Sequence, residues 1–176
     1  MEWANGFHQG LRKDMVSPEF SHQVAIASHV RTFAQILRYP EPTIVAAFCH
    51  DLREDYNVPD HEIRTRFGDL VADAVEALTK EFDQIRRDDS AVYAAIATNP
   101  IASVVKAADR IHNHSSMLGV FSPQKMLSYT DETRKFVLPM LKAARRAHPD
   151  QEPVYETLSL VLLSQLPLLE ALALVE

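Results

Sequence analysis

The stretch AAFCHDLREDYNV, residues 46–58, joins an apolar run to a turn that is crowded with charged side chains. The apolar run predicts a buried helix, and His50 and Asp51 stand side by side at its polar end. Together they offer one neutral nitrogen and one anionic oxygen to a single divalent cation. Because two ligands hold a catalytic metal poorly, we expect further ligands from other helices.

Two more acids follow within one helical turn. Glu54 and Asp55 come three and four residues after Asp51, so a continuing helix turns both towards the side of Asp51. Three carboxylates and a histidine packed this closely repel one another. A cation at this position, or the neighbouring Arg53, would relieve the repulsion.

Helical spacing recurs along the rest of the chain, whereas the alternation that is typical of strands is hard to find. The sequence contains only four glycines, the residue that tight hairpins use most. The expected helices cover about 17–38, 43–52, a segment from 59 or 60, 70–80, 101–118, 123–146 and the C-terminal run, with a loop or the start of a helix at 81–90. We therefore predict an all-α, single-domain bundle of about seven to nine helices over residues 1–176.

The composition is that of one globular domain, and it narrows the class of function. With 176 residues, 47% of them hydrophobic, the chain can bury one substantial core. The formal net charge of −6 lacks the basic footprint of a nucleic-acid binder, so we expect neither a nucleic-acid partner nor a membrane partner. A single cysteine, Cys49, excludes an internal disulfide framework, and we see no signal peptide, which together favour a cytoplasmic protein.

The apolar C-terminal run LSLVLLSQLPLLEALALVE, residues 158–176, is the one segment that could be mistaken for a membrane span. A proline and three polar residues interrupt it: Pro167, Ser164, Gln165 and Glu170. A spanning helix needs ~20 predominantly apolar residues. We interpret the run as a core or subunit-interface helix, kinked or broken near Pro167, through which a homo-oligomer can form.

Two further polar side chains lie within apolar helical segments. An aspartate on a buried helix face is costly unless it is paired or metal-bound. Taken alone, Asp109 favours a structural ion pair, for example with Arg110, and His22 favours an ordinary core histidine. The combination changes this balance, because the order H…HD…D collects four ligand-type side chains from separate helical segments.

This order resembles the ligand pattern of the HD metal-dependent phosphohydrolase superfamily, and the surrounding segments resemble its RelA/SpoT-type (small alarmone hydrolase) branch. There, an Arg-Lys-Asp stretch precedes the first histidine, an HD-x-x-ED motif follows, a Phe-Gly-containing helix pair comes next, and a Lys-x-Ala-Asp-Arg-x-x-Asn segment completes the site. The matching segments are HQGLRKDMVSPEFSHQVAIASHV (8–30), HDLREDYN (50–57), HEIRTRFGDLVADAVEALTK (61–80) and VVKAADRIHN (104–113). More loosely, KMLSYTDETRKFVLPML (125–141) resembles the helix that closes the site.

The resemblance implies a metal centre and an acid pair. Four side chains would ligate one divalent ion, usually Mn²⁺ in this family: His22, His50, Asp51 and Asp109. Glu54 and Asp55 match the pair that positions and activates the hydrolytic water. The metal and catalytic core then covers about 7–115, and the C-terminal helices, 123–176, close the site.

Substrate contacts are implied as well. Arg12 and Lys13 match basic residues along the phosphates, although in isolation they read as a solvated charge pair, and Asn113 matches a residue at the nucleotide end. Lys106 is either a substrate contact or a surface residue, and it can equally pair with one of the two acids that follow the HD dipeptide. Tyr129 comes four residues after Lys125 and can present a side chain to the site.

The reaction that the resemblance implies is removal of the 3′-pyrophosphate from guanosine tetra- or pentaphosphate, which gives GDP or GTP and pyrophosphate. The expected protein is thus a metal-dependent phosphohydrolase of the stringent response, with a nucleotide as its small-molecule partner. Because 176 residues leave no room for a synthetase domain, we expect a stand-alone hydrolase.

Departures from the family pattern keep alternatives open. The family usually has a Gly-Thr-Pro-Tyr-like run before the first histidine and a proline after it, where this chain has MVSPEFS and Gln23. Another HD phosphohydrolase would act on an adenosine alarmone, the 2′-phosphate of NADPH or a nucleoside monophosphate. A catalytically silent nucleotide-binding regulator is a further alternative, although none of the catalytic side chains is missing. A purely structural helical adaptor would leave the cluster of acids and histidines unexplained.

Overall fold

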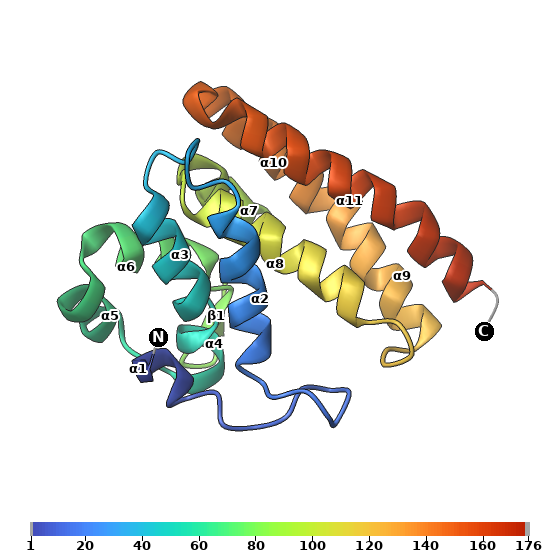
Figure 1. The fold of residues 1–176 in the computed structure, drawn as a ribbon, viewed down its shortest axis with the longest axis horizontal. Coiled ribbons are helices and arrows are strands. Elements are labelled where there is room, and N and C mark those ends of the chain that lie inside the picture. Colours follow the sequence, from blue (N-terminus) through green and yellow to red (C-terminus); the bar gives the residue numbers. More distant parts are fainter. Residues whose placement is uncertain (1, 175–176) are drawn as a thin grey trace.

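Helices make up nearly all the regular structure of residues 2–174, which are the residues that the computed structural model describes (Figure 1). In chain order they are α1 (Glu2–Asn5), α2 (Ser21–Arg31), α3 (Pro40–Cys49), α4 (Leu52–Tyr56), α5 (Asp60–Phe67), α6 (Asp69–Leu78), α7 (Asp89–Thr98), α8 (Ala102–Ser116), α9 (Pro123–Glu132), α10 (Leu138–Ala147) and α11 (Glu152–Ala173). Nine of these described helices contain eight or more residues, so the predicted all-α class is confirmed.

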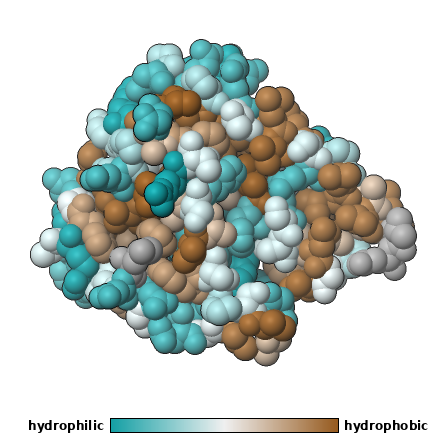
Figure 2. Space-filling model, in the orientation of Figure 1, coloured by the Kyte–Doolittle hydropathy of each residue, from teal (hydrophilic) through white to brown (hydrophobic). Residues whose placement is uncertain are grey.

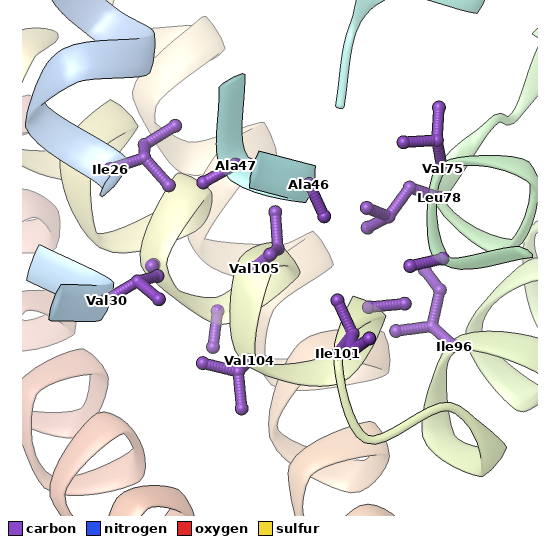
Figure 3. Packing of buried hydrophobic residues seen from close by; sticks show 14 of the residues in the cluster. Ile26, Val30, Ala46, Ala47, Val75, Leu78, Ile96, Ile101, Val104 and Val105 are labelled. Carbon is purple, nitrogen blue, oxygen red and sulfur yellow. The ribbon is translucent and has the colours of Figure 1, made fainter. Parts of the chain in front are cut away.

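The helix α8 lies at the centre of the core, because its buried side chains meet α2, α3, α6 and α7 (Figure 3). Its residues Val104 and Val105 are fully buried. Figure 3 shows them among Val30 of α2 and Ala46 of α3. Burying a valine side chain stabilises a fold by roughly 1.5–3 kcal/mol. This packing therefore fixes α8, and with it Asp109 on the same helix, relative to α2 and α3.

The helix α2 is shorter than the helix expected over 17–38. It begins only after a turn-containing segment that an isolated bridge between Leu11 and Pro18 closes. It ends before Thr32, whose hydroxyl donates a hydrogen bond of 2.6 Å to the carbonyl of His29. Such a bond competes with the backbone ladder, and turns carry the chain from there to α3.

Residues 81–86 form a β-hairpin where a loop or helix start was expected, and the helix α7 begins only at Asp89. The strands β1 (Glu81–Phe82) and β2 (Ile85–Arg86) pair antiparallel. The turn residues Asp83 and Gln84 both have positive φ, 50° and 63°, as a two-residue hairpin turn requires. The hairpin forms without glycine, so the low glycine content was a poor guide at this position.

The C-terminal half departs from regular α-helix at a π-helical turn and at a 3-10 turn, Pro149–Gln151, but not at Pro167. A π-helical turn, Thr133–Val137, separates α9 from α10 and interrupts the expected helix over 123–146. The helix α11 continues through Pro167, so the predicted break there is wrong (Figure 1). Pro167 is exposed, and solvent can therefore hydrate the backbone carbonyl that loses its N–H partner.

Among the described residues, α11 with the turn before it, Pro149–Ala173, is long and apolar enough to cross a membrane, with a mean hydropathy of 1.3. In the fold, α11 packs against α8, α9 and α10. Its other face carries exposed leucines: Leu160, Leu163, Leu168 and Leu172. Apolar side chains accordingly gather on the α11 side of the molecule in Figure 2.

Candidate metal centre and cleft

The four side chains predicted as metal ligands meet where α2, α3 and α8 pack together. His22 lies in the first turn of α2, and Asp109 lies in the middle of α8. His50 and Asp51 occupy the short break between α3 and α4. The core packing of these helices therefore gathers ligands from three separate parts of the chain.

The distances between the ligand atoms suit a single ion. Nε2 of His22 lies 3.2 Å from Oδ1 of Asp109 and 4.0 Å from Oδ2 of Asp51. Nε2 of His50 lies 3.0 Å from Oδ2 of Asp51 and 3.8 Å from Oδ1 of Asp109. Two atoms that each bind an ion at ~2.1 Å are at most ~4.2 Å apart, so all four distances are compatible with shared coordination. His22, His50 and Asp109 form a group whose ligand atoms all lie within 4.8 Å of one another, and Asp51 is not part of that group.

The surroundings of His50 show that these residues fit a cation. Its Nδ1–H donates a hydrogen bond of 2.9 Å to the carbonyl of Ala47. Its Nε2 is buried, has no assigned hydrogen-bond partner and lies 3.0 Å from Oδ2 of Asp51. A buried polar atom without a partner is costly, and a divalent cation between this nitrogen and the two carboxylates would satisfy all three groups.

Neighbouring charges at the metal centre favour the charged forms of Asp109 and His50. Burial by itself would raise the pKa of Asp109, but Lys106 and the two histidines hold it well below its ordinary value. Burial would lower the pKa of His50, but the Asp51 carboxylate outweighs it and raises that pKa to about 9. Ligation requires a neutral imidazole, so binding of a cation must displace this proton.

Two other side chains of α8 donate hydrogen bonds to the Asp109 carboxylate. The amide of Asn113 donates to Oδ1 at 2.6 Å, and the ammonium of Lys106 donates to Oδ2 at 3.0 Å. Asn113 was predicted as a nucleotide contact, and Lys106 as a substrate contact or a partner of Glu54 or Asp55. The structure instead pairs Lys106 with Asp109, which lies three residues further along the same helix.

His112 lies beside the metal centre, although no sequence pattern predicted it as a site residue. Its Nδ1 lies 2.8 Å from Nδ1 of His22, on the side of that ring away from the carboxylates. The two rings are 4.8 Å apart and tilted by 54°. The available signal was its position three residues after Asp109, which places both on neighbouring turns of one helix.

The acid pair of α4 divides between two environments. Asp55 lines the cleft beside the metal centre, whereas Glu54 is outside the lining and lies near the backbone N–H of Lys80, at the base of the hairpin. Partial burial, together with Asp51 and Glu54, raises the pKa of Asp55 to about 6. Partial burial also raises the pKa of Glu54. Carboxylates with raised pKa values are suited to accept a proton near neutral pH.

A cleft of about 250 Å³ opens onto the metal centre. Its lining includes the proposed ligands His22 and Asp51 and four side chains predicted to contact the substrate: Arg12, Lys13, Asn113 and Tyr129. Gln23, which replaces the proline of the family pattern, lines it too. Lys106 does not line the cleft. The cleft therefore joins one anionic, metal-binding end to one basic end.

The two cations of the cleft have no acidic partner within ion-pair distance among the described residues. Arg12 donates to the hydroxyl of Ser116 at 3.2 Å, and Lys13 lies 5.1 Å from the ring centre of Phe121. Burial lowers the pKa of Lys13, and the nearby Lys125 and Arg12 lower it further. Two neighbouring cations without an acidic partner, such as Arg12 and Lys13, favour the binding of an anionic ligand.

Comparison with known proteins identifies the family of this fold. A family model described as HD domain matches residues 1–96. A Synechocystis protein named probable guanosine-3′,5′-bis(diphosphate) 3′-pyrophosphohydrolase is 30% identical over 150 residues, which is 78% of this chain and 19% of that protein. A Brucella melitensis protein named GTP pyrophosphokinase rsh is 30% identical over 162 residues, 86% of this chain and 20% of that protein.

A Streptomyces antibioticus protein named GTP pyrophosphokinase is 30% identical over 121 residues, which is 65% of this chain and 14% of that protein. The chain thus spans about a fifth, or less, of the length of these relatives. Their names describe two opposite reactions of one group of nucleotides, so the names alone do not assign a reaction to this segment.

Proposed function

The chain belongs to the HD domain family, and from this membership and the geometry of the cleft we propose that it is a metal-dependent phosphohydrolase. The observation that carries the proposal is the cleft itself, which is lined by His22 and Asp51 of the metal centre and by the cations Arg12 and Lys13. A phosphate ester with a second anionic group would satisfy both ends. In the proposed reaction, water attacks phosphorus and an oxygen–phosphorus bond of the substrate breaks.

In this proposal, His22, His50, Asp51 and Asp109 hold one divalent ion, with Mn²⁺ as our choice. When bound, such an ion polarises a phosphoryl oxygen and lowers the pKa of water. The helices contribute rigidity, since three of the four ligands are buried side chains on packed elements. The raised pKa values of Glu54 and Asp55 support their proposed role, which is to orient the attacking water and accept its proton.

At the other end, Arg12 and Lys13 are proposed to bind the phosphates through charge-assisted hydrogen bonds. Asn113 and Tyr129 are proposed to contact the nucleotide, because both line the cleft. Lys106 is proposed to act on the substrate only indirectly, since its ammonium is engaged by Asp109.

The substrate that we propose is guanosine tetra- or pentaphosphate, cleaved to GDP or GTP and pyrophosphate. The name of the Synechocystis relative supports this choice. The replacement of the family proline by Gln23, inside the cleft, favours a second candidate: the same chemistry on an adenosine alarmone, the 2′-phosphate of NADPH or a nucleoside monophosphate.

The test is an assay of the purified chain with Mn²⁺ against guanosine tetraphosphate, an adenosine alarmone, NADPH and nucleoside monophosphates. Pyrophosphate and orthophosphate are measured separately, and Asp109→Asn serves as the inactive control. We expect pyrophosphate from guanosine tetraphosphate only. Orthophosphate from NADPH would favour the second candidate. Nucleotide binding without any product from metal-loaded protein would identify a silent regulator.

The remaining proposals concern the chain as a whole. We propose that residues 1–176 act as one domain in the cytoplasm, with the metal core within about 7–115 and the helices of 123–176 closing the cleft; Tyr129 of α9 already lines it. The exposed leucines of α11 support self-association through that helix. Sedimentation of the wild-type chain and of Leu160→Gln, an exposed position, would test this.

A further inference from the structure

The contact between His22 and His112 joins a proposed metal ligand to a second imidazole across the α2–α8 packing. Their Nδ1 atoms are 2.8 Å apart, which is hydrogen-bond distance. One of the two nitrogens must therefore carry a hydrogen and the other must accept it. The contact decides which nitrogen of His22 is protonated, and hence which nitrogen is free to bind a metal.

The other metal histidine shows what this decision requires. Nδ1 of His50 faces the carbonyl of Ala47, which can only accept, so the proton of His50 stays on Nδ1 and Nε2 faces the centre. His22 has no carbonyl at the equivalent place. Its Nδ1 faces an imidazole nitrogen, which accepts in one tautomer and donates in the other.

We propose that His112 is a positioning residue that sets the tautomer of His22 for metal binding, an inference that rests on the metal site of the proposed function. In the metal-loaded state, Nδ1–H of His22 donates to Nδ1 of His112, whose own proton lies on Nε2. In the metal-free state, His112 donates from Nδ1, and the proton of His22 lies on Nε2, which is 3.2 Å from Oδ1 of Asp109. Both states hold two protons on the two neutral rings.

A merely structural role for His112 predicts something different. A half-buried side chain that only fills space between α2 and α8 could be replaced by any residue of similar size. The proposed role needs an acceptor at the position of Nδ1. Asparagine supplies one, because its Oδ1 lies about as far from the backbone as Nδ1 of histidine, whereas leucine fills the space without it.

The test is calorimetric titration of Mn²⁺ into the metal-stripped full chain, in four forms: wild type, His112→Asn, His112→Leu and, as a control, His61→Leu at an exposed position of α5. Loss of partners that orient a metal-binding histidine typically weakens affinity by about 10- to 100-fold. We expect that loss in His112→Leu, recovery in His112→Asn to within about threefold of wild type, and no change in His61→Leu.

Wild-type affinity in His112→Leu would overturn the proposal, as would equal weakness of the leucine and asparagine variants. Absence of Mn²⁺ binding by the wild type would instead refute the metal site of the proposed function. If His112→Leu does not fold, ¹⁵N NMR of the wild type loaded with Zn²⁺, which is diamagnetic, decides. We expect His22 protonated at Nδ1 and His112 at Nε2; the reverse pair of tautomers would overturn the proposal.

Discussion

The ammonium of Lys106 donates a hydrogen bond of 3.0 Å to Oδ2 of Asp109, while Oδ1 of the same carboxylate faces His22 and His50. One buried aspartate thus contacts Lys106 through one oxygen and the two histidines through the other. Lys106 balances this carboxylate whether or not a metal ion is present, since its side chain is only 15% exposed.

The substitution Lys106→Met should therefore destabilise the metal-free protein. Removing one member of a buried ion pair leaves the other uncompensated, at a cost of about 3–5 kcal/mol. Mn²⁺ should recover part of this loss, because it supplies positive charge to the same carboxylate. Urea unfolding in EDTA and in Mn²⁺ measures both effects. The exposed Lys142→Met is the control, and a loss equal to that of Lys106→Met would contradict the prediction.

Substitution of a metal ligand should affect metal content and turnover, whereas substitution of the acid pair should affect turnover only. His50→Gln should lose bound metal and activity together. Glu54→Gln and Asp55→Asn should keep the metal and lower the rate of hydrolysis by about 10²-fold or more, since general acid–base catalysis contributes that much. Metal analysis of the purified variants, next to product release, checks the split. A normal rate in either acid variant would remove that residue from its proposed role.

Substitution of the cleft cations should act on substrate binding. Arg12→Ala removes a charge-assisted hydrogen bond to phosphate and should raise KM by about 10- to 100-fold with little change in kcat. Arg31→Ala provides a matched control, because Arg31 is exposed and does not line this cleft. Steady-state kinetics on the best substrate separates the two constants. A fall in kcat at constant KM would point to a role in the chemical step.

A second, partly buried charge cluster around Glu132 should matter for stability. Glu132 accepts hydrogen bonds from Lys80 at 2.5 Å and from Tyr93 at 2.8 Å, and it pairs with Arg110 at 2.6 Å. Burial opposes its charge, but Arg110 and Lys80 lower its pKa to about 2. The stabilisation is thus present above the ordinary pKa of 4.5 and is lost as pH falls towards 2.

At neutral pH, Glu132→Gln should cost about 3–5 kcal/mol of unfolding free energy. The control is Glu170→Gln, which breaks the exposed pair with Arg134 and should cost less than about 1 kcal/mol. Urea unfolding of both variants measures the difference. Equal losses would show that the buried cluster contributes no more than a surface pair.

Burial of His114 should add a second, weaker dependence of the unfolding free energy on pH. It is buried between Gln165 and Thr133, which lie 3.2 and 3.1 Å from its ring nitrogens. Burial lowers its pKa from 6.5 to about 4, so between these values the unfolded chain binds a proton that the folded chain does not. Stability should therefore fall as pH falls from 6.5 to 4, by at most about 3 kcal/mol from this group.

The variant His114→Gln should flatten this dependence, because glutamine has polar atoms for the same neighbours and does not titrate in this range. Unfolding free energies measured at several pH values in wild type and variant provide the comparison. Parallel curves would assign the acid sensitivity to other groups.

Local sequence patterns predict the helical class and place the proposed ligands His50 and Asp51 side by side. Periodic apolar residues such as Val104 and Val105 predict a helix from local spacing alone, and that spacing also predicts which face is buried. The adjacency of His50 and Asp51 is likewise a local fact. Local patterns were insufficient at the hairpin, because the left-handed turn at Asp83 and Gln84 needs no glycine.

Which side chains contact the proposed metal ligands depends on the packing of helices that lie far apart in sequence. His112 meets His22 across ninety positions of sequence, and this contact depends on how α2 and α8 pack, which no local spacing specifies. Lys106 was predicted as a substrate contact, a surface residue or a partner of Glu54 or Asp55, and in the folded chain it pairs with Asp109 instead. The physical reason is that periodicity sets the direction of a side chain from its own helix, whereas the distance between two helices is set by the packing of the whole core.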